Sequence, residues 1–175
     1  GWWEQIVGPG RIIDTDRYFV VAANVLGGCQ GSTGPASPAP DGAPWGSRFP
    51  VISTRDQVYA ESRLADLLGI DEWSIVVGTS LGGHRAIEWA VSYPERVRRL
   101  VVVASGAQTT ADQAAWTHTQ IRAIELDPAW RGGDYYAGPG PTAGLALARQ
   151  IAHTTYRSPS ELDERFGRIP QNDED

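Results

Sequence analysis

Three short apolar runs alternate with two amphipathic segments in the first part of the chain, and this alternation constrains the fold more than any other feature. The runs lie at 17–26, 73–77 and 99–104 and are rich in Val, Ile, Leu and Ala. The segments between them, 56–68 and 81–93, place apolar residues at helical spacing. Strands that are apolar along their whole length are typical of a parallel sheet covered by helices. The sequence therefore predicts an α/β fold with a mostly parallel sheet and flanking helices.

Turn and capping residues mark where these elements begin and end. Ser53 or Thr54 can cap the first helix, and Gly69 stands where a left-handed residue would close it. Pro94 ends the second helix. Between the first strand and the first helix, residues 27–50 are rich in Gly and Pro, which predicts a long loop. Long loops in compact domains are often functional.

No strand is expected after the third apolar run, and the remaining signals are helical. A capping box at Thr110 opens a helix that runs to about Leu126. Residues 141–155 form another helix, and Ser158 caps a short third one that has proline at its first position.

This pattern divides the chain into part of an α/β core at 1–107, a helical lid layer at 108–168 and a loose acidic end at 169–175. Three strands alone would leave both edges of a sheet unpaired. The 175 residues also include no methionine, not even at position 1. We therefore expect the chain to be a processed or excerpted part of a larger fold.

The second strand is joined to its helix by Gly78-Thr79-Ser80-Leu81-Gly82, a G-x-S-x-G sequence in the strand–turn–helix setting of a nucleophile elbow. Bulky side chains two residues on either side of the serine would collide with the helix and the neighbouring strand, so we expect Gly78 and Gly82 to relieve crowding. The Ser80 hydroxyl would then project above the carboxyl edge of the sheet. The Leu81 backbone N–H, at the positive end of the helix, is the expected first oxyanion donor.

The same five residues also fit a plain glycine-lined turn, because G-x-S-x-G occurs often by chance. A dinucleotide-binding fingerprint does not fit, since Gly78, Gly82 and Gly83 lack the G-x-G-x-x-G spacing. The position between an apolar strand and an amphipathic helix favours the catalytic interpretation.

A nucleophilic serine needs an acid and a general base, which in this arrangement follow it in the chain at the ends of later strands. The candidates are Asp127, Asp134 and His153, together with His84 on the elbow helix. None of the first three follows a predicted strand, and His84 is better suited to packing or capping. We therefore expect the catalytic acid and base to lie outside these 175 residues.

Composition excludes several functions. All 15 basic residues are arginine, so the chain has neither a Schiff-base lysine for pyridoxal phosphate nor a phosphate-loop lysine. The net charge of −6 argues against a nucleic-acid partner, and no apolar run approaches the roughly 18 residues that cross a membrane. The histidines at 84, 118 and 153 lack metal-binding spacing, and we expect no metal and no resident cofactor. Cys29, the single cysteine, fits a reducing, cytoplasmic setting.

Six blocks besides the elbow recur, in order along the chain, in one known family: 24–35, 45–50, 55–56, 88–97, 132–136 and 148–158. With the elbow they resemble homoserine O-acetyltransferases, which are acyltransferases of the α/β-hydrolase fold. The resemblance covers essentially the whole chain and is far more specific than G-x-S-x-G alone. Members of that family are roughly double this length. The resemblance therefore implies that this chain is their central part, without an earlier second oxyanion donor and a later catalytic Asp and His.

The resemblance implies that Ser80 is the nucleophile that accepts the acyl group and that Leu81 donates to the oxyanion. It implies that Arg149 binds the homoserine carboxylate, a role suited to the planar guanidinium fork. The alternative for Arg149 is an exposed helical arginine paired with a carboxylate. The implied reaction moves an acetyl group from the co-substrate acetyl-CoA to L-homoserine in methionine biosynthesis. We also expect a homodimer formed through the helical lid.

The chain departs from the family's common elbow, Gly-Gly-Ser-Met-Gly-Gly, at Thr79 and Leu81, and His84 and Arg85 stand where Met and Gln are frequent. A backbone donor survives the change to Leu81, but the shape of the acyl pocket is affected. Acetyl and succinyl donors therefore both stay open, as does a serine esterase on the same fold. A further alternative is a non-catalytic chain whose helical layer, with Trp116, serves only for self-association.

Overall fold

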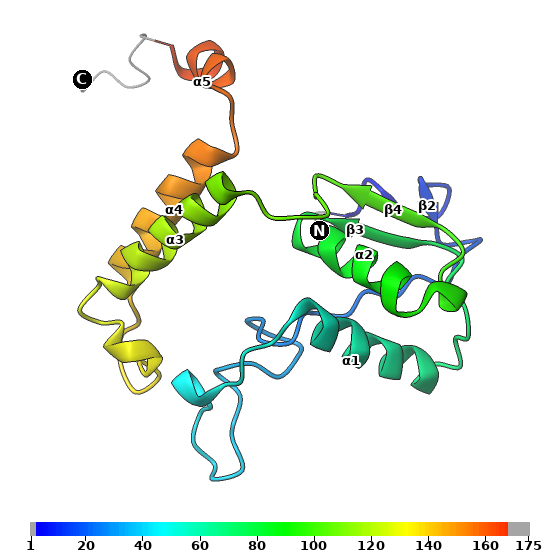
Figure 1. Cartoon of the computed structure of the whole chain (residues 1–175), viewed down its shortest axis with the longest axis horizontal. Helices are drawn as coiled ribbons and strands as arrows, with labels where there is room; N and C mark the ends of the chain where they lie inside the picture. Colours follow the sequence, from blue (N-terminus) through cyan, green and yellow to red (C-terminus); the bar gives the residue numbers. More distant parts are fainter. Residues whose placement is uncertain (1–2, 168–175) are drawn as a thin grey trace.

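The computed structural model describes residues 3–167, so the expected loose end at 169–175 lies outside the described residues. Along the chain, a short strand pair precedes an α/β part, and a helical layer follows (Figure 1). The strands are β1 (Val7–Gly8), β2 (Ile13–Asp14), β3 (Val76–Thr79) and β4 (Leu100–Val103). The helices are α1 (Thr54–Leu67), α2 (Leu81–Ser92), α3 (Ala111–Glu125), α4 (Thr142–Thr155) and α5 (Pro159–Phe166), with short 3-10 turns η1 (Gly46–Arg48), η2 (Pro94–Arg96) and η3 (Arg131–Gly133).

The α/β part is built on the parallel pair of β3 and β4, in register from Val76 opposite Leu100 to Thr79 opposite Val103. Parallel neighbours need a crossover connection, which α2 provides. α2 packs on both strands, and α1 packs on α2. This strand–helix–strand unit confirms the predicted α/β fold class.

The core of the α/β part gathers around Trp89 on α2, which is 3% exposed. Its ring meets Trp73 edge-on at 6.2 Å between centroids, and Val58 and Ala65 of α1 are fully buried in the same cluster. The indole N–H donates to Glu61 Oε2 at 2.7 Å, so the one polar atom of this ring is paired. The helix that carries the elbow is thus anchored by its largest side chain.

Local caps set the helix starts in both parts of the molecule. Ser53 Oγ accepts from Asp56 N–H at 3.2 Å, and Asp56 Oδ2 accepts from Ser53 N–H at 2.8 Å, which completes a capping box on α1. Thr110 and Gln113 form the same box on α3, and Ser158 caps α5. These caps confirm the helix starts predicted from the sequence.

The prediction of a sheet strand at 17–26 is wrong. Residues 18–25 carry no strand pairing, and Phe19 stays 76% exposed. An apolar, β-branched run favours extended backbone, but a strand also needs a neighbouring edge with which to pair. Here residues 21–23 and β3 both line a cavity of about 310 Å³. No strand within residues 3–167 fills the space between them.

The helical layer consists of α3 and α4, which pack side by side and stand to one side of the α/β part (Figure 1). Their seam uses three buried small residues of α4 at helical spacing: Gly144, Ala148 and Ala152. α3 buries none of its residues. Within the described part of the chain, no strand follows β4, and none of the helices has the length and apolar character to cross a membrane.

Candidate active site

Ser80 stands on the turn between β3 and α2 with φ 51° and ψ −121°. Non-glycine residues avoid this left-handed φ, which costs on the order of 1–3 kcal/mol and persists only where the surroundings hold it. The Ser80 N–H donates to Val103 O at 3.0 Å, and the Ser80 carbonyl accepts from Gly83 N–H at 2.9 Å. The residue is exposed. The sharp turn expected from the sequence is therefore present, and it leaves the serine accessible at the carboxyl end of β3.

A second serine, Ser105, helps to hold this turn. It follows β4, and its hydroxyl donates to the Ser80 carbonyl. Ala104, between β4 and Ser105, also has a positive φ, 52°. Sequence reasoning did not single out Ser105. The signal was available, because a polar residue just after the third apolar run lies at the same sheet edge as Ser80.

Two glycines of the elbow are required by close approach, but they are not the pair that the sequence predicted. A Cβ on Gly78 would overlap the Gly82 carbonyl and lie 2.7 Å from Gly83 N. This confirms the prediction that Gly78 relieves crowding at the turn. A Cβ on Gly82 would meet nothing within 4 Å in the described part of the chain, so the prediction that Gly82 relieves crowding is wrong. Gly83 is the crowded one, since a Cβ there would overlap the Ser105 hydroxyl.

The start of α2 supplies backbone donors beside the serine. Leu81 is the first residue of this helix, and the first N–H groups of a helix have no acceptor within it. They also carry the positive end of the helix dipole, which favours a negatively charged oxygen. His84, one turn along, donates its backbone N–H to the Ser80 carbonyl at 3.3 Å. Leu81 as the oxyanion donor stays a prediction.

The candidate acid and base residues are not gathered around the serine. Within residues 3–167 the Ser80 hydroxyl has no hydrogen-bond partner. Asp127 instead accepts from Gly144 N–H at 2.8 Å, and this hydrogen bond holds the pKa of Asp127 below its usual value. The His153 ring packs edge-on against Tyr156, with 6.5 Å between centroids. Both residues therefore have structural roles within the helical layer.

Asp134 is also engaged elsewhere. Its Oδ1 accepts from Ser47 N–H and its Oδ2 from the Ser47 hydroxyl, both at 2.8 Å. These two hydrogen bonds, with that of the backbone N–H the larger influence, lower the pKa of Asp134. The carboxylate joins two loops that are 87 residues apart in sequence, a link that the sequence did not reveal.

Arg149 is exposed on α4. It forms no ion pair with any carboxylate in the part of the chain that the structure describes. By contrast, Arg122 on the adjacent α3 pairs with Glu125 at 2.6 Å. The alternative reading of Arg149 as a paired surface arginine is therefore not observed, and its guanidinium keeps all its donors for another partner.

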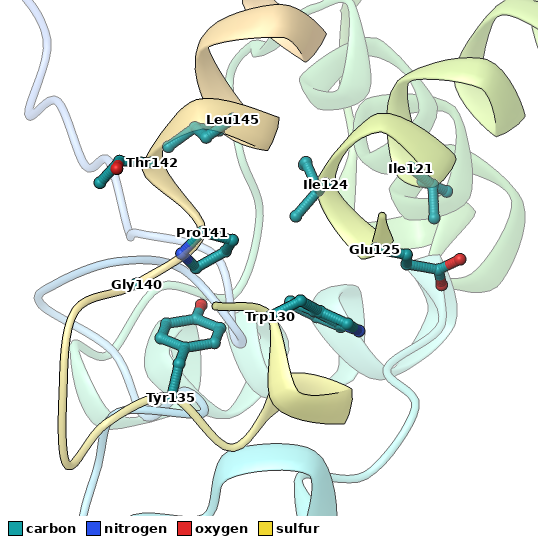
Figure 2. A pocket seen from close by; sticks show the side chains of 9 residues that line it. All are labelled: Ile121, Ile124, Glu125, Trp130, Tyr135, Gly140, Pro141, Thr142 and Leu145. Atoms are coloured by element: carbon teal, nitrogen blue, oxygen red, sulfur yellow. The ribbon is translucent and has the colours of Figure 1, made fainter. Parts of the chain in front are cut away.

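The helical layer holds a separate apolar cavity of about 380 Å³ (Figure 2). Side chains from α3 and α4 face one another across it, and the rings of Trp130 and Tyr135 close one end. Neither Ser80 nor Arg149 lines it. Its walls are Ile121, Ile124, Glu125, Trp130, Tyr135, Gly140, Pro141, Thr142 and Leu145.

A strained, accessible serine on the turn between a parallel strand and a helix is typical of α/β hydrolases. The whole chain, residues 1–175, matches the family model described as the alpha/beta hydrolase fold. The chain belongs to the α/β hydrolase family.

Individual relatives and solved structures indicate which kind of α/β hydrolase the chain resembles. The chain is 63% identical to a homoserine O-acetyltransferase of Thermobifida fusca over 177 residues, which cover 100% of this chain and 47% of the relative. The crystal structure of a homoserine O-acetyltransferase from Bacillus anthracis matches with a TM-score of 0.88 at 32% identity, over 98% of this chain and 48% of that one. An acetylester hydrolase from Corynebacterium glutamicum matches with a TM-score of 0.84 at 30% identity, over 97% and 50%. The resemblance seen in the sequence is confirmed, and the chain spans about half the length of the curated relatives it matches.

Proposed function

We propose that this chain carries the nucleophile of a homoserine O-acetyltransferase, which moves an acetyl group from acetyl-CoA to the hydroxyl of L-homoserine in methionine biosynthesis. The observation that carries the proposal is Ser80, accessible and held at φ 51° at the end of β3. Relatives that are 57–63% identical and named homoserine O-acetyltransferase support the choice of reaction.

In the proposed first half-reaction, Ser80 Oγ attacks the carbonyl carbon of the acetyl thioester and gives its proton to a general base. The tetrahedral oxyanion is stabilised by the Leu81 N–H at the start of α2. The C–S bond then breaks, and CoA leaves as the thiol after taking that proton. The product is acetyl-Ser80. Because the Ser80 hydroxyl has no partner within residues 3–167, we expect the base to come from residues that flank this chain.

In the second half-reaction, the homoserine hydroxyl gives its proton to the general base and attacks the carbonyl carbon of acetyl-Ser80. The C–O bond to Ser80 then breaks, and Ser80 Oγ takes that proton back. Water competes at this step, and transfer prevails only if the amino acid is held closer and better oriented than water. The unpaired guanidinium of Arg149 is suited to this task, since two parallel N–H donors fix a carboxylate in one orientation. We propose that no resident cofactor takes part and that the reaction takes place in the cytoplasm.

A serine esterase is the second candidate. The acetylester hydrolase from Corynebacterium glutamicum supports it, because that protein matches almost the whole chain on the same fold. Both candidates use Ser80 in the same way and differ only in the acceptor. A succinyl donor would likewise change only the acyl group.

The experiment that separates these candidates uses the full-length protein and follows the acyl-enzyme. Mixing with acetyl-CoA should release one equivalent of CoA per active site, and peptide mass mapping should locate the acetyl group on Ser80. Adding L-homoserine should then yield O-acetylhomoserine rather than acetate. Acetate alone would favour the esterase, and faster acylation by succinyl-CoA would favour the succinyl donor. No acylation by any donor would favour a non-catalytic chain.

We also propose that the helical layer forms the interface of a homodimer. Large apolar side chains stay exposed on α3 and α4, including Trp116 at 43%, Leu145 at 50% and Leu147 at 49%. Exposed apolar side chains that gather on one layer are typical of association surfaces. Light scattering on the full-length protein should give twice the monomer mass, and a monomer at all concentrations would rule the dimer out.

A further inference from the structure

The helical layer and the α/β part meet mainly through two loops rather than through their helices. The principal contact between their elements joins η1, in the loop that precedes α1, to η3, in the loop between α3 and α4. In Figure 1 these are the cyan and yellow loops, which approach one another below the two parts. The position of α4, and of Arg149 on it, therefore depends on how these loops are joined.

The joint is a bidentate hydrogen bond around one carboxylate. Asp134 accepts from both the backbone N–H and the hydroxyl of Ser47 at 2.8 Å. Gly46 leaves room for the carboxylate, because a Cβ there would overlap Asp134 Oδ1. On the other side, a Cβ on Gly133 would lie 3.4 Å from Ser47 Cβ. We call these four residues the clasp: Gly46, Ser47, Gly133 and Asp134.

The clasp is continuous with a packed aromatic segment that leads to both helices. Tyr135 stacks on Tyr136 at 4.8 Å and meets Trp130 at 5.7 Å between ring centroids. Burial raises the pKa of Tyr136 to about 12. Trp130 and Tyr135 also close the cavity between α3 and α4 (Figure 2). A shift at Asp134 would therefore be passed to the end of α3 and the start of α4.

Arg131, shortly before Asp134, has a strained backbone. Arg131, Gly132 and Gly133 have φ values of 50°, 67° and 97°, which places three successive residues in the left-handed region. Arg131 is not a glycine, and such a conformation persists only where its surroundings hold it. The hydrogen bonds from Gly133 N–H to Trp130 O and from Asp134 N–H to Arg131 O hold this segment from within. The hydrogen bonds between Asp134 and Ser47 add the restraint that comes from the other loop.

We propose that Asp134 is a positioning residue for the acyl-transfer step. By holding Ser47, it keeps the helical layer, and Arg149 with it, in place relative to Ser80. This inference rests on the proposed function. It concerns the acceptor step alone, because the elbow is held by other groups: β3, β4 and the Ser105 hydroxyl. The Asp134 carboxylate binds Ser47 rather than Ser80, so in this proposal it acts through the placement of Arg149.

The test uses full-length protein and measures the two half-reactions separately. Acylation of Ser80 is followed with p-nitrophenyl acetate, a small donor that needs no amino-acid site. The partition of acetyl-Ser80 between L-homoserine and water, and the KM for L-homoserine, report the acceptor step. Asp134→Ala, which removes both acceptors of the clasp, should leave acylation unchanged and shift both acceptor measurements on the order of tenfold, because a small misplacement of a binding group is costly at this step.

Three further variants sharpen the result. Ser47→Ala should give a smaller shift, because the Ser47 N–H still reaches Asp134. The double variant should be no worse than Asp134→Ala, since Asp134→Ala already removes both hydrogen bonds to Ser47, including the one that Ser47→Ala removes. Asp127→Ala is the matched control, because Asp127 also accepts from backbone N–H groups, but both of its partners lie within the helical layer. It should keep the wild-type partition.

Equal losses in acylation and transfer for Asp134→Ala would overturn the positioning role, as would an equal shift in the Asp127→Ala control. Additive effects of the two clasp changes would also contradict it. If the wild-type protein is not acylated at all, the proposed function itself fails, and the positioning role falls with it.

Discussion

The α/β part and the helical layer differ in the contacts that hold each of them together. The first surrounds Trp89 with apolar and aromatic side chains and links its two helices through the Arg85–Glu61 ion pair. The second meets along small residues of α4 and leaves large apolar side chains outside, such as Leu126 at 70% exposure. The α/β part can therefore hold a strained serine by its own contacts, whereas the helical layer depends on contacts beyond its own seam.

Ser80, the proposed nucleophile, offers the largest test of this division. Ser80→Ala should lower kcat for acetyl transfer on the order of 10⁶-fold, because the covalent route loses its acceptor. Affinity for L-homoserine, measured by calorimetry on the full-length protein, should stay, since Arg149 lies in the other part. Simultaneous loss of binding would mean that the two parts are not separable in function.

A pair of tryptophans tests the difference in packing. Trp89→Ala should lower the free energy of unfolding by about 3–5 kcal/mol, because it empties the centre of the core. Trp116→Ala on α3, where the side chain is 43% exposed, should change the unfolding of the monomer by only about 0.5 kcal/mol and should weaken self-association instead. Denaturant titration and light scattering measure the two effects. A comparable cost for both would show that the helical layer has a core of its own.

Arg149 on α4 and Arg122 on α3 should differ in their effect on the reaction. Arg149→Lys should raise the KM for L-homoserine roughly tenfold to a hundredfold, because an ammonium cannot make two parallel hydrogen bonds to a carboxylate. The first half-reaction with acetyl-CoA should be unaffected. Arg122→Lys, at an exposed arginine already paired with Glu125, is the control and should match the wild type. A similar change in KM for both would point to general charge rather than to a binding site.

The smallest expected effect concerns the hydroxyl that holds the elbow. Ser105→Ala removes one hydrogen bond to the Ser80 carbonyl, worth about 0.5–1.5 kcal/mol, and should slow the acylation of Ser80 by p-nitrophenyl acetate about three- to tenfold. Ser92→Ala removes the hydrogen bond of Ser92 to Glu88 at the far end of α2 and should leave acylation unchanged. An equal slowing in both variants would indicate that α2 as a whole had loosened.

The sequence predicted those features whose signals are local. The capping residues Ser53 and Thr110 act on amides within the same turn, so their neighbours along the chain decide the outcome. The elbow was predictable for the same reason, since the overlap that a side chain on Gly78 would cause involves only residues 82 and 83. Helix starts and the strained turn therefore followed from short stretches of chain in both parts.

Features that depend on distant residues were missed or misjudged. The contact of Asp134 with Ser47 spans 87 residues, and no local pattern shows it. The run at 17–26 has strand-forming composition, but pairing depends on a neighbouring edge and not on its own residues. Gly83 rather than Gly82 is crowded because Ser105 reaches it from the end of another strand. In each case the decisive atom belongs to a segment far along the chain.

The short sheet has a practical consequence. In the described residues β3 pairs only with β4. Each strand therefore has one edge without a partner strand, and the backbone N–H and C=O groups of such an edge can pair with an extended segment of another chain. A preparation restricted to these residues should tend to precipitate through such backbone ladders. Its yield would then be governed by chaperones, dilution and temperature long before any turnover is assayed.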